Sequence, residues 1–180
     1  MHSMTYTRET LVAELRKNGI AYLAPSDAVA TEPIYSPAEL ITAILEQSDA
    51  RLKLALVPLF IRQPHLSRFV PDLVDQLDPV LALDLQTYYM AAVYLQRHWR
   101  TRLSRYLGVT SLLPDLYSQQ LGLSSAEEYH GKMGLYELAD VWKERSQYPF
   151  NRLAALKQTI DLFFGQLQTE KWSLKYASES

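Results

Sequence analysis

The sequence predicts an all-α protein, an irregular bundle of about seven helices around one long central helix. Three observations support this fold class. No stretch alternates apolar and polar side chains over the length of a strand. Glycine is scarce, with six residues, and four of them fall where a helix is expected to stop or bend. Apolar residues recur at helical spacing along most of the chain.

Helix start signals divide the chain into segments. The clearest is Ser36-Pro37-Ala38-Glu39, because serine caps, proline suits the first helical position and glutamate completes a capping box. Pro58 is expected to kink the third helix, Pro71 to split the fourth, and Gly131 and Gly134 to weaken the seventh. The tail over 173–180 is polar and is expected to fray. The predicted helices cover residues 7–18, 37–47, 49–62, 64–77, 79–107, 111–120, 124–148 and 151–172.

The longest predicted helix, over residues 79–107, rests on one apolar stripe. Successive members stand four, three, four, three, four, four and three residues apart, which keeps them on one face of a continuous helix. They are Leu81, Leu85, Tyr88, Ala92, Leu95, Trp99, Leu103 and Tyr106. Such a helix would be about 43 Å long. We expect its stripe in the core and its opposite face in solvent.

Residues 37–62 read as two helices joined at Asp49, and this hairpin resembles one unit of the HEAT class of helical repeats. A second, degenerate copy begins near Asp72. The usual aspartate-to-arginine spacing is not kept, and a solenoid needs about three stacked units. We therefore expect a HEAT-like hairpin that packs locally, without a repeat array.

Composition places the chain among globular proteins. It has no cysteine, which excludes disulfides and thiolate metal sites and is typical of a reducing cytosol. Residues 1–9 contain no apolar run, so no signal peptide is expected, and the longest apolar run, 54–61, is too short for a membrane span. We expect a cytoplasmic protein with a single domain over residues 1–180, with Met4 as an alternative start.

Motifs for catalysis and cofactors are weak. Glu127 and His130 have the Glu-x-x-His spacing that would place both on one helix face, but di-iron bundles use two such motifs and two further glutamates. Gly131-Lys132 lacks the other residues of a phosphate-binding loop, and no Gly-x-Ser-x-Gly elbow occurs. We therefore expect no catalytic residue, no metal and no cofactor.

Positive charge is concentrated between Arg97 and Tyr106. This decapeptide holds four arginines and no carboxylate, whereas the whole chain has a formal charge of −2. On a helical wheel Arg97, His98 and Arg105 form an exposed basic ridge, with Tyr94 beside it and Arg100 and Arg102 flanking the apolar stripe. The cations either pair with carboxylates on neighbouring helices or form a contact surface for an acidic partner.

Two regions resemble an uncharacterised family of small helical bacterial proteins, associated with cyanobacteria, whose members are genome neighbours of minimal nucleotidyltransferases. The resemblance rests on Asp49-Ala50-Arg51-Leu52 and Leu59–Leu66 within residues 40–69, and on Ala91–Arg97 and Leu112-Leu113-Pro114-Asp115 within residues 88–121. It covers about half of the chain and transfers no functional residue. It implies a protein partner, with a nucleotidyltransferase-like protein as one candidate.

Three functions follow as hypotheses. The first is a non-enzymatic protein–protein interaction module, favoured by the basic ridge and by 12 tyrosines, a residue enriched at interfaces. The second is a nucleic-acid-binding protein that uses the ridge over 97–105, although a pI near 6.1 argues against it. The third is a metal-dependent or other enzyme centred on Glu127 and His130. A homodimer is also expected to be possible, since small helical proteins often bury a second apolar face in this way.

Overall fold

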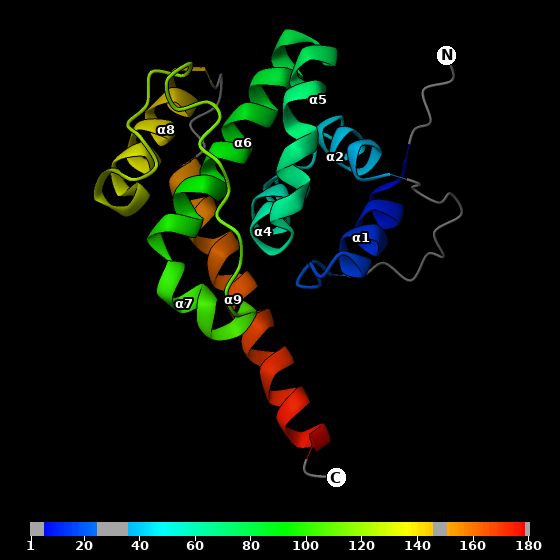
Figure 1. Cartoon of the computed structure of the whole chain (residues 1–180). Coiled ribbons are helices and arrows are strands. Elements are labelled where there is room, and N and C mark those ends of the chain that lie inside the picture. Colours follow the sequence, from blue (N-terminus) through cyan, green and yellow to red (C-terminus); the bar gives the residue numbers. More distant parts are fainter. Residues whose placement is uncertain (1–5, 25–35, 146–150, 179–180) are drawn as a thin grey trace. The chain divides into compact units, whose positions relative to one another are not determined.

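A computed structural model describes residues 6–24, 36–145 and 151–178 (Figure 1). All regular structure in these ranges is helical, so the predicted fold class is confirmed. The α-helices are α1 (Arg8–Lys17), α2 (Pro37–Leu45), α3 (Ala50–Leu54), α4 (Leu56–Arg62), α5 (Val70–Gln76), α6 (Pro79–His98), α7 (Arg100–Leu107), α8 (Lys132–Arg145) and α9 (Arg152–Ser178), and the 3-10 helices are η1 (Pro64–Phe69) and η2 (Glu128–Gly131). Within these ranges, none of the helices combines the length and apolarity that a membrane crossing needs.

The chain divides into two compact units, residues 1–92 and 93–180. Helix α6 runs from the first into the second, and every residue from Leu85 to Gln96 is buried. A helix enclosed on all sides is the centre of a bundle, as predicted. The expected solvated face is wrong for this stretch, because polar residues such as Gln86 and Gln96 are buried along with the stripe. The single-domain prediction concerns how the two units fold together and stays a prediction.

Helix caps in the first unit follow the sequence closely. Thr7 caps α1, Ser36 Oγ accepts a hydrogen bond from the Glu39 amide at 3.2 Å, and the Asp49 carboxylate accepts from the amides of Arg51 and Leu52. Arg8 Nε donates to Asp49 at 2.9 Å, so one carboxylate both caps α3 and ties α1 to it. The hydrogen bonds to the charged form lower the pKa of Asp49 although burial opposes them.

Prolines divide the helices of the predicted HEAT-like hairpin and of the segment that follows. The second helix of the hairpin is interrupted at Ala55, which separates α3 from α4. Pro58 explains the break, because its ring has no N–H and crowds the carbonyl four residues earlier, that of Leu54. Residues 64–76 likewise divide into η1 and α5, with Pro71 in the first turn of α5. Both predicted proline effects are confirmed.

The single rod predicted over residues 79–107 is wrong. Trp99 leaves helical geometry, with φ −103° and ψ 18°, and separates α6 from α7. Hydrogen bonds still flank the turn, from the Trp99 amide to Leu95 at 2.9 Å and from the Leu103 amide to Trp99 at 2.8 Å. Two successive four-residue steps turn a stripe by about 80° around a straight helix. The turn at Trp99 absorbs this drift, and the indole packs edge-on against Phe164 with ring centroids 5.7 Å apart.

Two other helix predictions in the second unit are also wrong. Residues 111–120 contain no helix, because side chains of α6 hold their backbone in an extended path, as described below. The tail predicted to fray is helical as far as Ser178, where the described residues end. Asn151 does cap α9, with its Oδ1 accepting from the Ala154 amide at 3.0 Å. The predicted end of the preceding helix, at residue 148, lies outside the described residues.

Candidate interaction site

Tyr94, predicted to border the basic ridge, is instead a buried residue of the second unit. Its hydroxyl donates to the Ser124 carbonyl at 2.8 Å, and burial raises the pKa of the phenol well above its usual value of 10.0. Two glycines explain how α8 approaches so closely. A Cβ at Gly131 would lie 2.5 Å from the Tyr94 carbonyl oxygen, and a Cβ at Gly134 would lie 2.1 Å from the Tyr94 ring. Gly131 directly precedes α8, and α8 is continuous across Gly134, where a weak point was predicted.

Arg97 does not belong to an exposed ridge either. Its side chain is only 8% exposed and donates in three directions. Nε binds Glu127 at 2.8 Å, Nη1 binds Gln96 Oε1 at 3.2 Å and Nη2 binds the Leu113 carbonyl at 2.8 Å. The bond to Glu127 matches the predicted alternative in which a cation pairs with a neighbouring carboxylate. Arg97 therefore stabilises the fold and is withdrawn as an exposed contact residue.

Gln96, which sequence reasoning missed, explains why residues 111–120 are not helical. The buried amide accepts from the Leu113 amide at 2.7 Å and donates to the Ser111 carbonyl at 3.0 Å, as a neighbouring β-strand would. Asp115 and Glu137 hold the rest of the loop. Asp115 accepts from the amides of Ser118 and Ala126, and Glu137 accepts from the amide and hydroxyl of Ser124. The sequence offers no periodic signal for such pairing.

Glu127 and His130 do not share a helix face. Glu127 precedes η2 and pairs with Arg97, whereas His130 and Tyr129 have left-handed backbone conformations, with φ of 53° and 46°. The predicted α-helix from residue 124 is therefore wrong as far as Gly131, and α8 begins only at Lys132. Gly131 lies against the backbone of Tyr94. In the part of the chain that the structure describes, no group of three or more histidine, aspartate or glutamate side chains is arranged to hold a metal.

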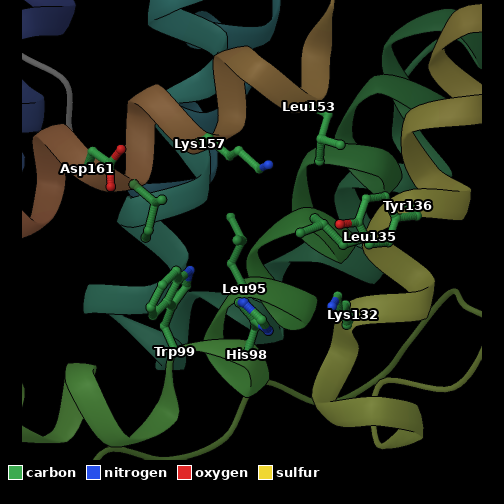
Figure 2. Close-up of a pocket in the computed structure, with 10 residues that line it drawn as sticks. Leu95, His98, Trp99, Lys132, Leu135, Tyr136, Leu153, Lys157 and Asp161 are labelled. Carbon is green, nitrogen blue, oxygen red and sulfur yellow. The ribbon is translucent and has the colours of Figure 1, made fainter.

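A cavity of about 210 Å³ lies beside these structural residues, between the end of α6, α8 and α9 (Figure 2). Its walls are mainly apolar, and two lysines, one histidine and one aspartate stand at its edge. Figure 2 shows these side chains around one central space. The lining residues are Leu95, His98, Trp99, Lys132, Leu135, Tyr136, Leu153, Lys157, Ile160 and Asp161.

A second, shallower hollow of about 380 Å³ shares His98 and Trp99 with the cavity and continues along α7. Its other lining residues are Thr101, Arg102, Arg105 and Tyr106. Arg102 lies over the Phe164 ring at 3.8 Å from its centroid, and Lys171 lies over Tyr106 at 5.6 Å. We call the cavity and this hollow together the 98–106 surface.

His98 separates the two hollows and is exposed. Its ring packs edge-on against Trp99, with centroids 4.9 Å apart. Partial burial, together with the nearby Lys132 and His130, lowers the pKa of His98 below its usual 6.5, which disfavours the charged form of the ring. The charge of the surface therefore comes from its lysines and arginines.

The structure thus brings together three of the six predicted site residues, His98, Arg102 and Arg105. Arg100 is exposed on α7 but lines neither hollow, and Tyr94 and Arg97 are engaged elsewhere. Sequence reasoning missed Lys132 and Lys157. They lie on other helices, 33 and 58 residues along the chain from Trp99, and only tertiary packing reveals their proximity.

Fold and site together define the class: an all-helical protein with a largely apolar cavity whose lining includes two lysines. Comparison of the chain with protein-family models, curated proteins and solved structures finds no match.

Proposed function

We propose that the protein is a non-enzymatic interaction module whose 98–106 surface binds an acidic segment of a partner protein. One observation supports this most directly. Four cationic side chains, Lys132, Lys157, Arg102 and Arg105, line two adjoining hollows. Among the described lining residues, Asp161 is the one carboxylate that faces them. A surface of one sign attracts and orients a partner of the opposite sign.

The shape of the surface indicates what the partner presents. A cavity of about 210 Å³ with apolar walls suits one aromatic or aliphatic side chain, which would supply most of the binding free energy as a buried anchor. The cations at the edge would then meet carboxylates that flank this anchor. The resemblance described above suggests a nucleotidyltransferase-like protein as the partner, and this identity remains part of the proposal.

Site-specific photo-crosslinking in cells tests the proposal. A photoreactive residue at Thr101 lies in the basic hollow, and the same residue at Ser104 lies on α7 outside it. We expect one protein to be captured at position 101 and not at position 104. Equal capture at both positions, or none at either, would contradict a defined binding surface.

The captured protein is then purified and its affinity is measured. The double variant R102E/R105E should weaken binding by at least about tenfold, because it reverses two charges on the surface. R100E is the matched control, since it makes the same change on the same helix outside both hollows. It should bind like the wild type.

Nucleic acid is the second candidate, because arginines stand beside the rings of Trp99 and Tyr106 in the same hollow. The whole-chain charge of −2 makes it the weaker one. If RNA or single-stranded DNA is the partner, affinity will fall steeply as salt increases, and R102E/R105E will abolish it. Absence of binding at low salt eliminates this candidate.

A further inference from the structure

The outer face of α9 carries a second stripe of side chains that its own unit does not cover. The inner stripe is buried and consists of Leu156, Ile160, Phe163 and Leu167. The outer stripe advances by three and four residues in strict alternation, the spacing of a coiled-coil seam over about three heptads, or about 33 Å. Its members are Ala155, Gln158, Leu162, Gly165, Thr169, Trp172 and Tyr176, and we call them the α9 seam.

The seam exposes large apolar side chains. Leu162 is 47% exposed, Trp172 57% and Tyr176 60%. The rings of Trp172 and Tyr176 lie one turn apart with centroids separated by 6.3 Å. An open hollow of about 770 Å³ extends along the seam from Gln158 past Gly165. Contiguous exposed apolar surface of this kind is typical of an interaction site.

One polar side chain of the seam, that of Thr169, already has its hydrogen-bond partner within the helix. The Thr169 hydroxyl donates to the Gly165 carbonyl at 3.0 Å, so its methyl group remains for contact. Burial of Thr169 would therefore leave no orphaned donor on its side chain.

Two features of α9 have no explanation within the unit. None of the side chains from Gln168 to Ser178 is buried, although Lys171 contacts α7 and helices in proteins are stabilised mainly by packing of an apolar face. Gly165 lies within the helix, where glycine costs about 1 kcal/mol relative to alanine, and a Cβ there would meet nothing within 4 Å. A second helix packed along the seam would account for both features.

We propose that this second helix is α9 of another copy of the chain, in antiparallel orientation. In that register Leu162 and Trp172 each meet a small residue, and Tyr176 lies beyond the last paired layer. Leu162 packs against the second copy's Gly165, Trp172 against its Ala155, and Gln158 beside its Thr169. The twofold symmetry repeats each layer, which makes six layers from one complementary pattern.

A parallel pair fits the same seam poorly. Each residue would then meet its own copy, so Gly165 would leave a gap while Trp172 and Tyr176 crowded their equivalents. Lys171 and Lys175 would also gather at one end of the pair, and like charges repel. The antiparallel pair places these lysines at opposite ends.

The seam residues are distinct from those that line the 98–106 surface. Lys157 and Asp161 line both that surface and the hollow along the seam, so dimerisation is tested at Trp172, which lines none of the three hollows.

Sedimentation of the full chain from about 1 to 100 μM tests the proposal. We expect the mass to rise toward twice 20.7 kDa. Trp172→Glu should raise the dissociation constant by about 30-fold or more, because the dimer would lose two large aromatic anchors, one in each terminal layer, and gain a charge in place of each. A wild-type chain that stays at 20.7 kDa over this range overturns the proposal.

Leu174→Glu is the matched control. Leu174 is 73% exposed in the same helical segment, yet it lies two residues from Trp172 and so on the opposite side of the helix. This variant should dimerise like the wild type. If it dissociates as readily as Trp172→Glu, the effect is general to the segment and the seam is not the interface. Circular dichroism of both variants shows whether the fold is retained.

Orientation is read from disulfides, because the native chain has no cysteine. Gln158→Cys and Thr169→Cys proteins are mixed and oxidised. The antiparallel register joins one variant to the other, whereas a parallel pair joins each variant to itself. Disulfides predominantly within each variant would overturn the antiparallel arrangement.

Discussion

Residues 94–97 and residues 98–106 are adjacent in the chain, yet the first segment is buried and the second lines an open hollow. The first group is buried, and its polar atoms bind the loop before η2: Tyr94 holds Ser124, Gln96 holds Ser111 and Leu113, and Arg97 holds Leu113 and Glu127. The second group turns at Trp99 and lines an open hollow. Two arginines eight residues apart thus differ in their surroundings: Arg97 stabilises the fold, whereas Arg105 lines the open hollow that we propose as a binding surface. Charge alone does not identify a binding residue; its hydrogen-bond partners do.

The largest expected effect is on the buried side of this comparison. Gly131→Ala should lower the free energy of unfolding by about 3 kcal/mol or more, because the new methyl overlaps the Tyr94 backbone and the residue must keep φ at +78°. Gly122→Ala is the control: its φ is +68° but its surroundings are open, so it should cost only about 1–2 kcal/mol. Urea unfolding measures both. Equal losses would mean that the contact with Tyr94 is unimportant.

Arg97→Ala should come next, at about 2–3 kcal/mol, because it leaves the Leu113 carbonyl and the Gln96 amide without a charged partner. The exposed Arg100→Ala should change stability by less than about 0.5 kcal/mol. Thermal or urea unfolding of the two variants gives the comparison. An effect of Arg97→Ala as small as that of Arg100→Ala would contradict the stabilising role assigned to the Arg97 hydrogen bonds.

Arg102→Ala is expected to have a smaller effect on stability, about 0.5–1 kcal/mol, from the lost stacking over Phe164. Its main consequence should be weaker binding of the acidic partner. A loss of stability without any change in affinity would show that Arg102 belongs with Arg97 as a structural residue.

The smallest expected effect is on pH dependence. Burial, Lys132 and His130 hold the pKa of His98 in the folded chain below 6.5, its value in the unfolded chain. At a pH between the folded and the unfolded pKa, the unfolded chain therefore binds more protons than the folded one. The His98 contribution to stability is therefore complete above about pH 6.5 and declines as the pH falls toward the folded pKa. An NMR titration should place the midpoint of His98 below 6.5, and an acidic partner should raise it. A free-state midpoint at or above 6.5 contradicts this account.

Local sequence signals predicted what local forces control. The cap predicted at Ser36 is satisfied, and Thr7 and Asp49 cap α1 and α3 in the same way, because a capping hydrogen bond spans only two or three residues. The breaks near Pro58 and Pro71 follow from the geometry of the proline ring itself. The all-helical fold class depends on the same short-range information, namely periodicity and the placement of helix-breaking residues.

The candidate site depends on contacts that no short-range pattern encodes. The sequence by itself determined where positive charge is concentrated, that the fold is helical and where proline interrupts the helices. Tertiary structure decided that Trp99 packs against Phe164 and that Arg97 hydrogen-bonds to the loop at Leu113. It also decided that Lys132 and Lys157, from other helices, line the cavity. The physical reason is range: caps and periodicity act within one or two turns, whereas burial and pairing of a side chain depend on residues that only the folded chain brings near.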